Sequence, residues 1–99
     1  MSKITLRGYL WVPAEDLDSV KEALSGHIES TLAEKGCITF EVSQDRDDPY
    51  RFNVFEEFTN RESFEAHQQR VATSKWSRVS ARSKRHYEVH EEPTHRKHP

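Results

Sequence analysis

The fold of this chain is decided by one stretch, Tyr50-Arg51-Phe52-Asn53-Val54-Phe55-Glu56-Glu57-Phe58. Its alternation is typical of a β-strand, because successive side chains of a strand point to opposite faces. Phe52, Val54, Glu56 and Phe58 therefore share one face, and that face is otherwise apolar. Burial of a carboxylate there costs several kcal/mol unless a partner or a wet cavity satisfies it. We therefore expect a small polar pocket beside Glu56.

The residues after this strand predict a helix that faces the same layer. Asn60 can cap the helix through its side-chain oxygen, and Phe64, His67 and Val71 recur at helical spacing. His67 is therefore expected to point where Phe64 points. An inward imidazole and the inward carboxylate of Glu56, one strand-to-helix turn apart, are the predicted polar residues of the pocket.

Three more strands are predicted from the same alternation, at residues 4–12, 37–43 and 85–91. A helix separates the first two, because the buried stripe Leu17, Val20, Leu24, Ile28 and Leu32 has the helical period. A second helical segment is expected to restart near residue 73 or 74. The resulting order β-α-β-β-α-β is the ferredoxin-like split unit, an α+β fold in which an antiparallel sheet carries helices on one face.

Size and composition limit the classes of protein. Ninety-nine residues make one domain, which we place at residues 1–91, with a flexible polar tail at 92–99. The net charge of −2, with both signs interspersed, predicts no nucleic-acid partner. The chain has neither a signal pattern nor an apolar run near ~20 residues, so we expect no membrane association. One cysteine, Cys37, fits a reducing, cytoplasmic location, and without a basic neighbour it is not expected to be a nucleophile.

Large apolar side chains occur on both faces of the predicted sheet, and two helices can cover only one of them. A homodimer closed through the other sheet face would bury it and would supplement an apolar fraction of only 33%. A monomer with a partly apolar exposed face is the alternative. Tyr9 and Trp11 are the expected aromatic interface residues, and the expected polar contacts across the interface come from Arg7, Asn53 and Glu57.

Several short motifs resemble the antibiotic biosynthesis monooxygenase superfamily. They are Glu34-Lys35-Gly36-Cys37-Ile38, Asp48-Pro49-Tyr50-Arg51-Phe52, Phe55-Glu56-Glu57-Phe58-Thr59-Asn60 and Phe64-Glu65-Ala66-His67. The likeness spans roughly residues 4–91. It implies a dimeric α+β barrel with a pocket between helices and sheet inside each subunit. Members of this superfamily include cofactor-independent oxygenases of quinols and polyphenols, haem-degrading enzymes and signal-processing isomerases.

The resemblance also narrows the choice among these activities. Haem-degrading members carry an asparagine on the first strand and an axial histidine after the second helix, and those positions fall on Gly8 and approximately Ser80 here. Their loss counts against haem degradation, so no cofactor is expected. The small Gly8 would instead widen the pocket beside Glu56. The expected lining of the pocket is Gly8, Phe40, Glu56, Phe64, His67 and Trp76.

Glu56 and His67 have a catalytic and a structural interpretation. In the first, His67 accepts a phenolic or enol proton, and Glu56 orients the substrate or shares its hydrogen bond. A phenolate formed in this way can pass an electron to dioxygen, which predicts a monooxygenase for a quinol or polyphenol. The alternatives are a non-oxidative isomerase or decarboxylase that acts through an enol, and a non-catalytic dimer that binds a small aromatic or quinone-like molecule. In the structural interpretation the two residues form a buried hydrogen bond, or Glu56 caps backbone amides.

The remaining candidates have simpler explanations. His27 lies about 60° from the centre of the apolar stripe of its helix, so it could reach the same cavity, but we expect its polar tip in water. Trp76 is expected in the core, or alternatively as a wall for a flat ligand. No metal site is predicted, because the spacing of the last four histidines matches no closed zinc pattern. These are His86, His90, His95 and His98.

Overall fold

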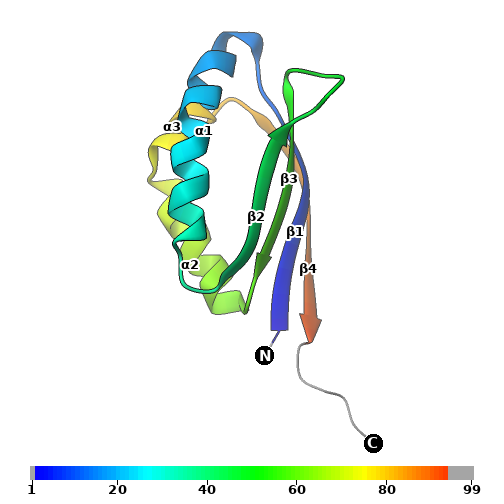
Figure 1. Cartoon of the computed structure of the whole chain (residues 1–99), viewed down its shortest axis with the longest axis vertical. Coiled ribbons are helices and arrows are strands. Elements are labelled where there is room, and N and C mark those ends of the chain that lie inside the picture. Colours follow the sequence, from blue (N-terminus) through cyan, green and yellow to red (C-terminus); the bar gives the residue numbers. More distant parts are fainter. Residues whose placement is uncertain (1, 94–99) are drawn as a thin grey trace, which may run out of the picture.

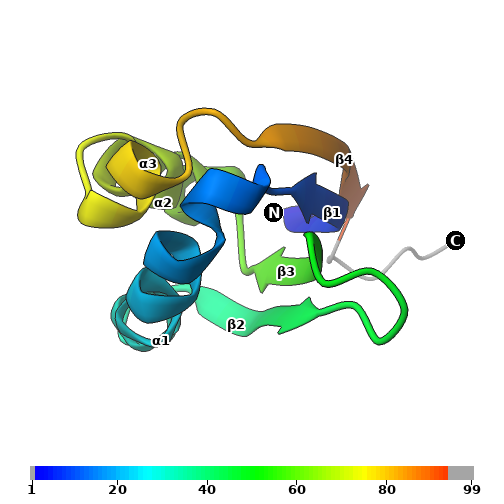
Figure 2. The same cartoon turned by 90° about the horizontal axis from the view of Figure 1, so that it is seen from above.

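The structure is a computed structural model that describes residues 2–93, and its helices all lie on one face of a single sheet (Figure 1, Figure 2). This arrangement confirms the predicted α+β, ferredoxin-like fold, with the second helical segment divided into two helices. The elements in chain order are β1 (Ser2–Trp11), the short 3-10 helix η1 (Ala14–Asp16), α1 (Leu17–Leu32), β2 (Cys37–Gln44), β3 (Arg51–Phe58), α2 (Arg61–Ala72), α3 (Lys75–Val79) and β4 (Lys84–Pro93).

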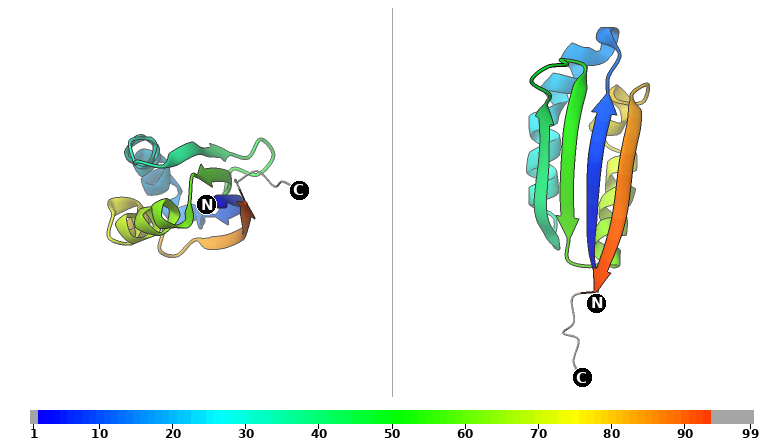
Figure 3. Two further views of the ribbon diagram at one scale, coloured as in Figure 1. Left: turned by 90° about the horizontal axis from the view of Figure 1, so that it is seen from below. Right: turned by 90° about the vertical axis from the view of Figure 1, so that its right-hand side faces the viewer.

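The four strands are all antiparallel and lie in the order β2-β3-β1-β4. Leu6 of β1 lies opposite Glu56 of β3, and Leu10 lies opposite Phe52. The inward residues of the two central strands therefore stand side by side. Figure 3 (right) shows the other face of the sheet, which no helix within residues 2–93 covers.

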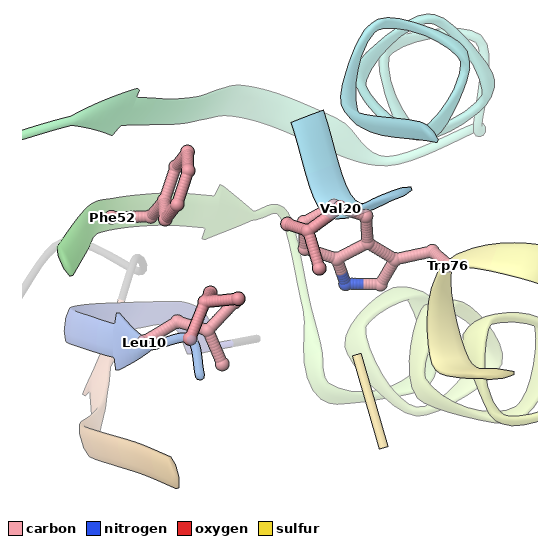
Figure 4. Close-up of a cluster of buried hydrophobic side chains, with 5 residues drawn as sticks. Leu10, Val20, Phe52 and Trp76 are labelled. Atoms are coloured by element: carbon pink, nitrogen blue, oxygen red, sulfur yellow. The ribbon is translucent and has the colours of Figure 1, made fainter. Parts of the chain in front are cut away.

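A compact apolar cluster fixes the helices on one end of the sheet (Figure 4). Its members are all at most 7% exposed, and they come from β1, β3, α1, α3 and the residue after β1: Leu10, Val12, Val20, Phe52 and Trp76. Glu56 lies four residues from Phe52 along β3, about 13 Å at the rise of a strand. The apolar core and the polar region around Glu56 therefore occupy different parts of the same layer.

Two side-chain caps set the starts of the second and third helices. The Asn60 side chain accepts a hydrogen bond from the Ser63 amide at 2.8 Å, as predicted for α2. The Ser74 hydroxyl accepts one from the Ser77 amide at 3.3 Å and starts α3. The predicted restart near residue 73 or 74 is therefore confirmed, and α3 carries Trp76 into the core.

The buried stripe of α1 differs from the prediction. Leu32 is 54% exposed, whereas Val20, His27 and Thr31 are the buried residues of the helix. The helix is rotated relative to its most apolar face, because α3 packs against its flank at His27. This rotation brings a histidine to the inside and leaves a leucine outside.

The last strand is longer than predicted. Its pairing with β1 runs from Trp11↔Lys84 to Ser2↔Pro93, so the first two residues of the predicted tail belong to β4. Residues 94–99, with His95 and His98, lie outside the described residues. No helix within residues 2–93 is long and apolar enough to cross a membrane. The cytoplasmic location stays a prediction.

Gly8 does not widen the pocket, contrary to the interpretation from sequence. Its φ is +150°, and a Cβ added there would lie 1.9 Å from the backbone carbonyl oxygen of His86. The space that a side chain would need is therefore filled by the backbone of β4. The absence of a side chain at Gly8 allows β1 and β4 to approach closely at this position.

Replacement of Gly8 by alanine should destabilise the fold by about 2 kcal/mol or more, because the added methyl group collides with a backbone that cannot move alone. Gly26→Ala in α1 is the matched control, since its Cβ would meet nothing within 4 Å. That control should gain up to about 1 kcal/mol from helix propensity. Urea unfolding of both variants checks the contrast, and equal effects would contradict the role given to Gly8.

Candidate functional site

A cavity of about 470 Å³ lies between the helices and the inner face of the sheet. This volume is within the range of small-molecule sites. Four of the six predicted pocket residues line it, namely Phe40, Glu56, His67 and Trp76. Gly8 does not, for the reason given above, and Phe64 instead packs edge-on against the Phe58 ring, with the centroids 5.7 Å apart.

His67 is held in one orientation by a carboxylate that the sequence analysis did not select. The ring is 3% exposed, and its Nδ1 lies 2.8 Å from Oε1 of Glu34, in the turn after α1. Since an ionised carboxylate only accepts hydrogen bonds, we assign the proton to Nδ1. The Nε2 atom then carries the lone pair. Burial lowers the pKa of His67, while the nearby Glu34 opposes the shift, so the imidazole is neutral at pH 7.

Glu34 is in turn fixed by Arg70, whose Nε donates to its second oxygen. The Arg70 Nη2 also donates to the Thr31 hydroxyl at 3.1 Å, and that hydroxyl donates to the His27 carbonyl at 2.9 Å. The network joins the C-terminal end of α1 to α2. One signal of it was present in the sequence, because His67 and Arg70 are i, i+3 neighbours on a helix and so share a face.

Glu56 lies in the cavity without a hydrogen-bond partner on Oε1 among the described residues. Burial, and secondarily the negative charge of Glu34, raise the pKa of Glu56 to about 7. Its Oε1 is 3.8 Å from Nε2 of His67, too far for a hydrogen bond. The direct Glu56–His67 bond of the structural interpretation is therefore not formed. Both groups instead direct unpaired acceptor positions toward the same space.

His27 is a wall of the cavity, so the alternative that it reaches the cavity is confirmed and the preferred prediction that its polar tip lies in water was wrong. The side chain is only 8% exposed. Its ring stacks on Trp76, with centroids 4.5 Å apart and planes within 2°, and it meets the edge of Phe40 at 5.2 Å. Burial first, and then nearby positive charge, lowers the pKa of His27 to about 4. The periodicity of α1 could not decide between the two positions, because the covering residue belongs to α3.

The last strand completes the cavity with two residues that the sequence analysis missed, Arg85 and Tyr87. They alternate onto the inner face of β4. Burial raises the pKa of the Tyr87 hydroxyl to about 12, so it stays protonated. Arg85 donates to the carbonyl of Ser80 at 3.2 Å and to its hydroxyl at 2.7 Å.

The other candidates lie apart from this cavity. His86 stacks on Tyr9 at 4.7 Å, and His90 Nε2 lies 3.5 Å from Oε1 of Glu88. Burial raises the pKa of the Cys37 thiol, which opposes thiolate formation. Within residues 2–93 no group of three or more histidine, cysteine or acidic side chains is arranged to hold a metal ion.

The buried Glu56 should make stability depend on pH. Its pKa rises from an ordinary 4.5 to about 7 on folding, so the native state binds the extra proton between these values. The free energy of unfolding therefore falls as pH rises through this window. Glu56→Gln removes this loss, and the variant should gain on the wild type by about 3 kcal/mol between about pH 4 and pH 8. Urea unfolding of both proteins across this range measures the difference between their free energies of unfolding. The titration of His27 contributes equally to both proteins and so cancels from this difference.

Glu57→Gln is the matched control on the opposite face of β3. Hydrogen bonds from Thr39, and then from Lys3, lower the pKa of Glu57. Its carboxylate therefore stabilises the fold above its ordinary pKa, and this contribution is lost as the pH falls through the lowered value. The control should lose stability toward neutral pH, where Glu56→Gln gains it. Parallel pH profiles for the two variants would refute the assignment.

Comparison with known proteins gives a matching family model and several solved structures with a similar fold. A family model described as antibiotic biosynthesis monooxygenase matches residues 3–79. A Nitrosomonas europaea protein, named as a presumptive antibiotic biosynthesis monooxygenase, shares 24% identity over 91% of this chain and 86% of its own, with a TM-score of 0.73. A conserved Bacteroides thetaiotaomicron protein of unknown function shares 21% over 91% and 97%, with a TM-score of 0.72.

A further solved structure, titled antibiotic biosynthesis monooxygenase, shares 22% identity over 97% of this chain and the whole of its own, with a TM-score of 0.68. At these identities the solved structures support the fold alone. No curated protein shows a match. Because the family model matches far more than half of its residues, this chain belongs to the antibiotic biosynthesis monooxygenase family.

Proposed function

We propose that the protein is a cofactor-independent monooxygenase that oxidises a small quinol or polyphenol-type aromatic with dioxygen. The observation that carries the proposal is the state of His67. Its Nδ1–H is fixed by Glu34 at 2.8 Å, and its free Nε2 faces an aromatic-lined cavity beside Glu56. Membership of the antibiotic biosynthesis monooxygenase family supports the oxygenase class.

The first step is removal of a phenolic proton by Nε2 of His67. The imidazolium that forms is stabilised by the Glu34 carboxylate, which already accepts its Nδ1–H. The electron-rich phenolate then reduces dioxygen. One oxygen atom enters the ring as a quinone carbonyl, and the other leaves as water. The phenol supplies all the electrons, so the reaction needs no external reductant.

Other cavity residues suit the later steps. With a pKa of about 7, Glu56 is partly protonated at neutral pH and can donate a proton to the oxygen that leaves as water. The coplanar His27–Trp76 stack, with Phe40 beside it, offers flat surfaces against which an aromatic ring can pack. Because burial keeps His27 neutral, this surface carries no charge of its own.

One observation favours a second candidate, a non-oxidative enol-handling isomerase or decarboxylase. His67 and Glu56 form an acid–base pair in which Nε2 of His67 and Oε1 of Glu56 are 3.8 Å apart. At pH 7 the Nε2 atom carries no proton, and the carboxyl group of Glu56 is near half-protonation. Such a pair can move a proton between two positions of a substrate without oxygen. Oxygen consumption separates the two candidates.

We also propose that two copies pair through the outer face of the sheet. Arg7 stacks over the Phe55 ring at 5.0 Å and Arg51 over the Tyr9 ring at 3.9 Å, while Trp11 is 37% exposed. This face is an aromatic and cationic layer that no helix within residues 2–93 covers. Its burial against a second copy would form the dimeric barrel that the sequence predicts.

Phe55→Glu should convert the dimer to a monomer, because it places a carboxylate at the centre of the proposed interface. The matched control is Leu32→Glu, which puts the same charge at an exposed leucine on α1. Sedimentation velocity of the wild type and both variants measures the assembly. A monomeric wild type, or a Phe55→Glu protein that stays dimeric, would refute the proposal.

Dioxygen uptake by metal-stripped protein with a panel of hydroquinones and polyphenols tests the activity. The wild type should exceed the autoxidation blank, and His67→Ala should lose about 10²- to 10⁴-fold of the rate. Glu34→Gln should be slower and should move the acidic limb of the pH–rate profile to lower pH, because Glu34 raises the pKa of His67.

The control for these variants is His90→Ala, a surface histidine outside the cavity, which should keep the full rate. No uptake across the panel would contradict the oxygenase. Exchange of substrate protons with solvent deuterium, without oxygen uptake, would instead support the isomerase.

A further inference from the structure

Arg85 is a fixed cation in the cavity wall. Its two Nη atoms donate to the carbonyl and hydroxyl of Ser80, which is fully buried and whose hydroxyl donates to the Trp76 carbonyl at 2.7 Å. The guanidinium is therefore held at the C-terminal end of α3. Of its five N–H donors, two bond Ser80 and one is used by the hydroxyl of Tyr87, which leaves two for another acceptor.

No carboxylate within residues 2–93 forms an ion pair with this guanidinium. The contrast with Arg70 is direct, because Arg70 is paired with Glu34. Glu56, the carboxylate that lines the same cavity, is not an ion-pair partner of Arg85 either. Its pKa is raised by burial and by Glu34, whereas a guanidinium beside it would lower it. The cavity thus contains a positive charge that no carboxylate of the described part of the chain neutralises.

Arg85 and the His67–Glu56 pair lie at different ends of the cavity. In the sheet register Arg85 lies opposite Leu10, which lies opposite Phe52, whereas Glu56 lies opposite Leu6. This is a displacement of four residues, or about 13 Å, along the strands, and β1 lies between the two strands that carry Arg85 and Glu56. Because both side chains line one cavity, a ligand that contacts both needs one group for each at separate positions of its ring.

We propose that the substrate is a hydroxylated aromatic carboxylate, whose carboxylate binds Arg85 and whose phenolic hydroxyl lies at His67. The geometry of a guanidinium suits this, because two parallel N–H groups match the two oxygens of a carboxylate. The ring between the two groups packs against the His27–Trp76 stack. The position of the hydroxyl rests on the proposed function, whereas the carboxylate site does not.

The test is anaerobic calorimetric binding, so that no turnover occurs. The probes are two matched pairs, gentisate with gentisamide and protocatechuate with protocatechuamide, in which the amide replaces one carboxylate oxygen with an NH2 group and so loses the negative charge. The wild type should bind at least one acid about ten- to hundredfold more tightly than its amide. Arg85→Gln should bring the acid close to the affinity of the amide.

Arg82→Gln is the control, since Arg82 is nearby in sequence but is exposed and paired with Asp16. It should leave the acid-to-amide ratio unchanged. Arg85→Lys, which keeps the charge, should retain part of the preference and serves if the glutamine variant does not fold. Equal affinity of the wild type for acid and amide, or no binding of either acid, would overturn the proposal without any variant.

The two proposals can fail independently. Strong acid preference without oxygen uptake would leave the carboxylate site standing and remove the oxygenase. Uptake with neutral hydroquinones, but no acid preference, would leave the oxygenase standing and remove the role of Arg85 in binding.

Discussion

The hydrogen bond between His67 and Glu34 is the interaction on which the rest of the site depends. It joins the turn after α1 to α2, and it determines which imidazole nitrogen carries the proton. The same carboxylate acts on Glu56, whose pKa is raised by burial and by the charge of Glu34. One side chain, held by Arg70, therefore raises the pKa of both groups that face the cavity, in addition to the larger effect of burial on each.

The sheet was largely predictable because its signal is local. The burial of β3 alternates without exception from Arg51 to Phe58, so the period of two identified Glu56 as an inward carboxylate. The helix α1 shows where such reasoning ends. Hydropathy selects Leu32 over His27, yet Leu32 is exposed and His27 is buried. Which flank of a helix is covered depends on its neighbours, and here α3 decides it.

The sequence predicted which residues belong to the candidate site better than it predicted the contacts between them. A strand and a helix pattern show which way side chains point, and this was enough to select Glu56 and His67. Pattern gives no distances, so the true partner of His67 was not recognised as Glu34, a residue in a turn with no periodicity. Arg85 was missed for a related reason, since an arginine at the start of a polar strand resembles a surface residue. Only the register of β4 places it in the cavity wall.

The shortness of α3 makes one wall of the cavity dependent on tertiary contacts. Five residues are too few to persist as an isolated helix in water. This helix exists because Trp76 is docked on His27 and because Ser74 and Arg85 secure its two ends. Trp76 is also a wall of the cavity, so that wall lasts only as long as the docking contact. Local unfolding of α3 would therefore remove this wall, and the Trp76–His27 stack and the contacts at the two helix ends set the free energy that such unfolding costs.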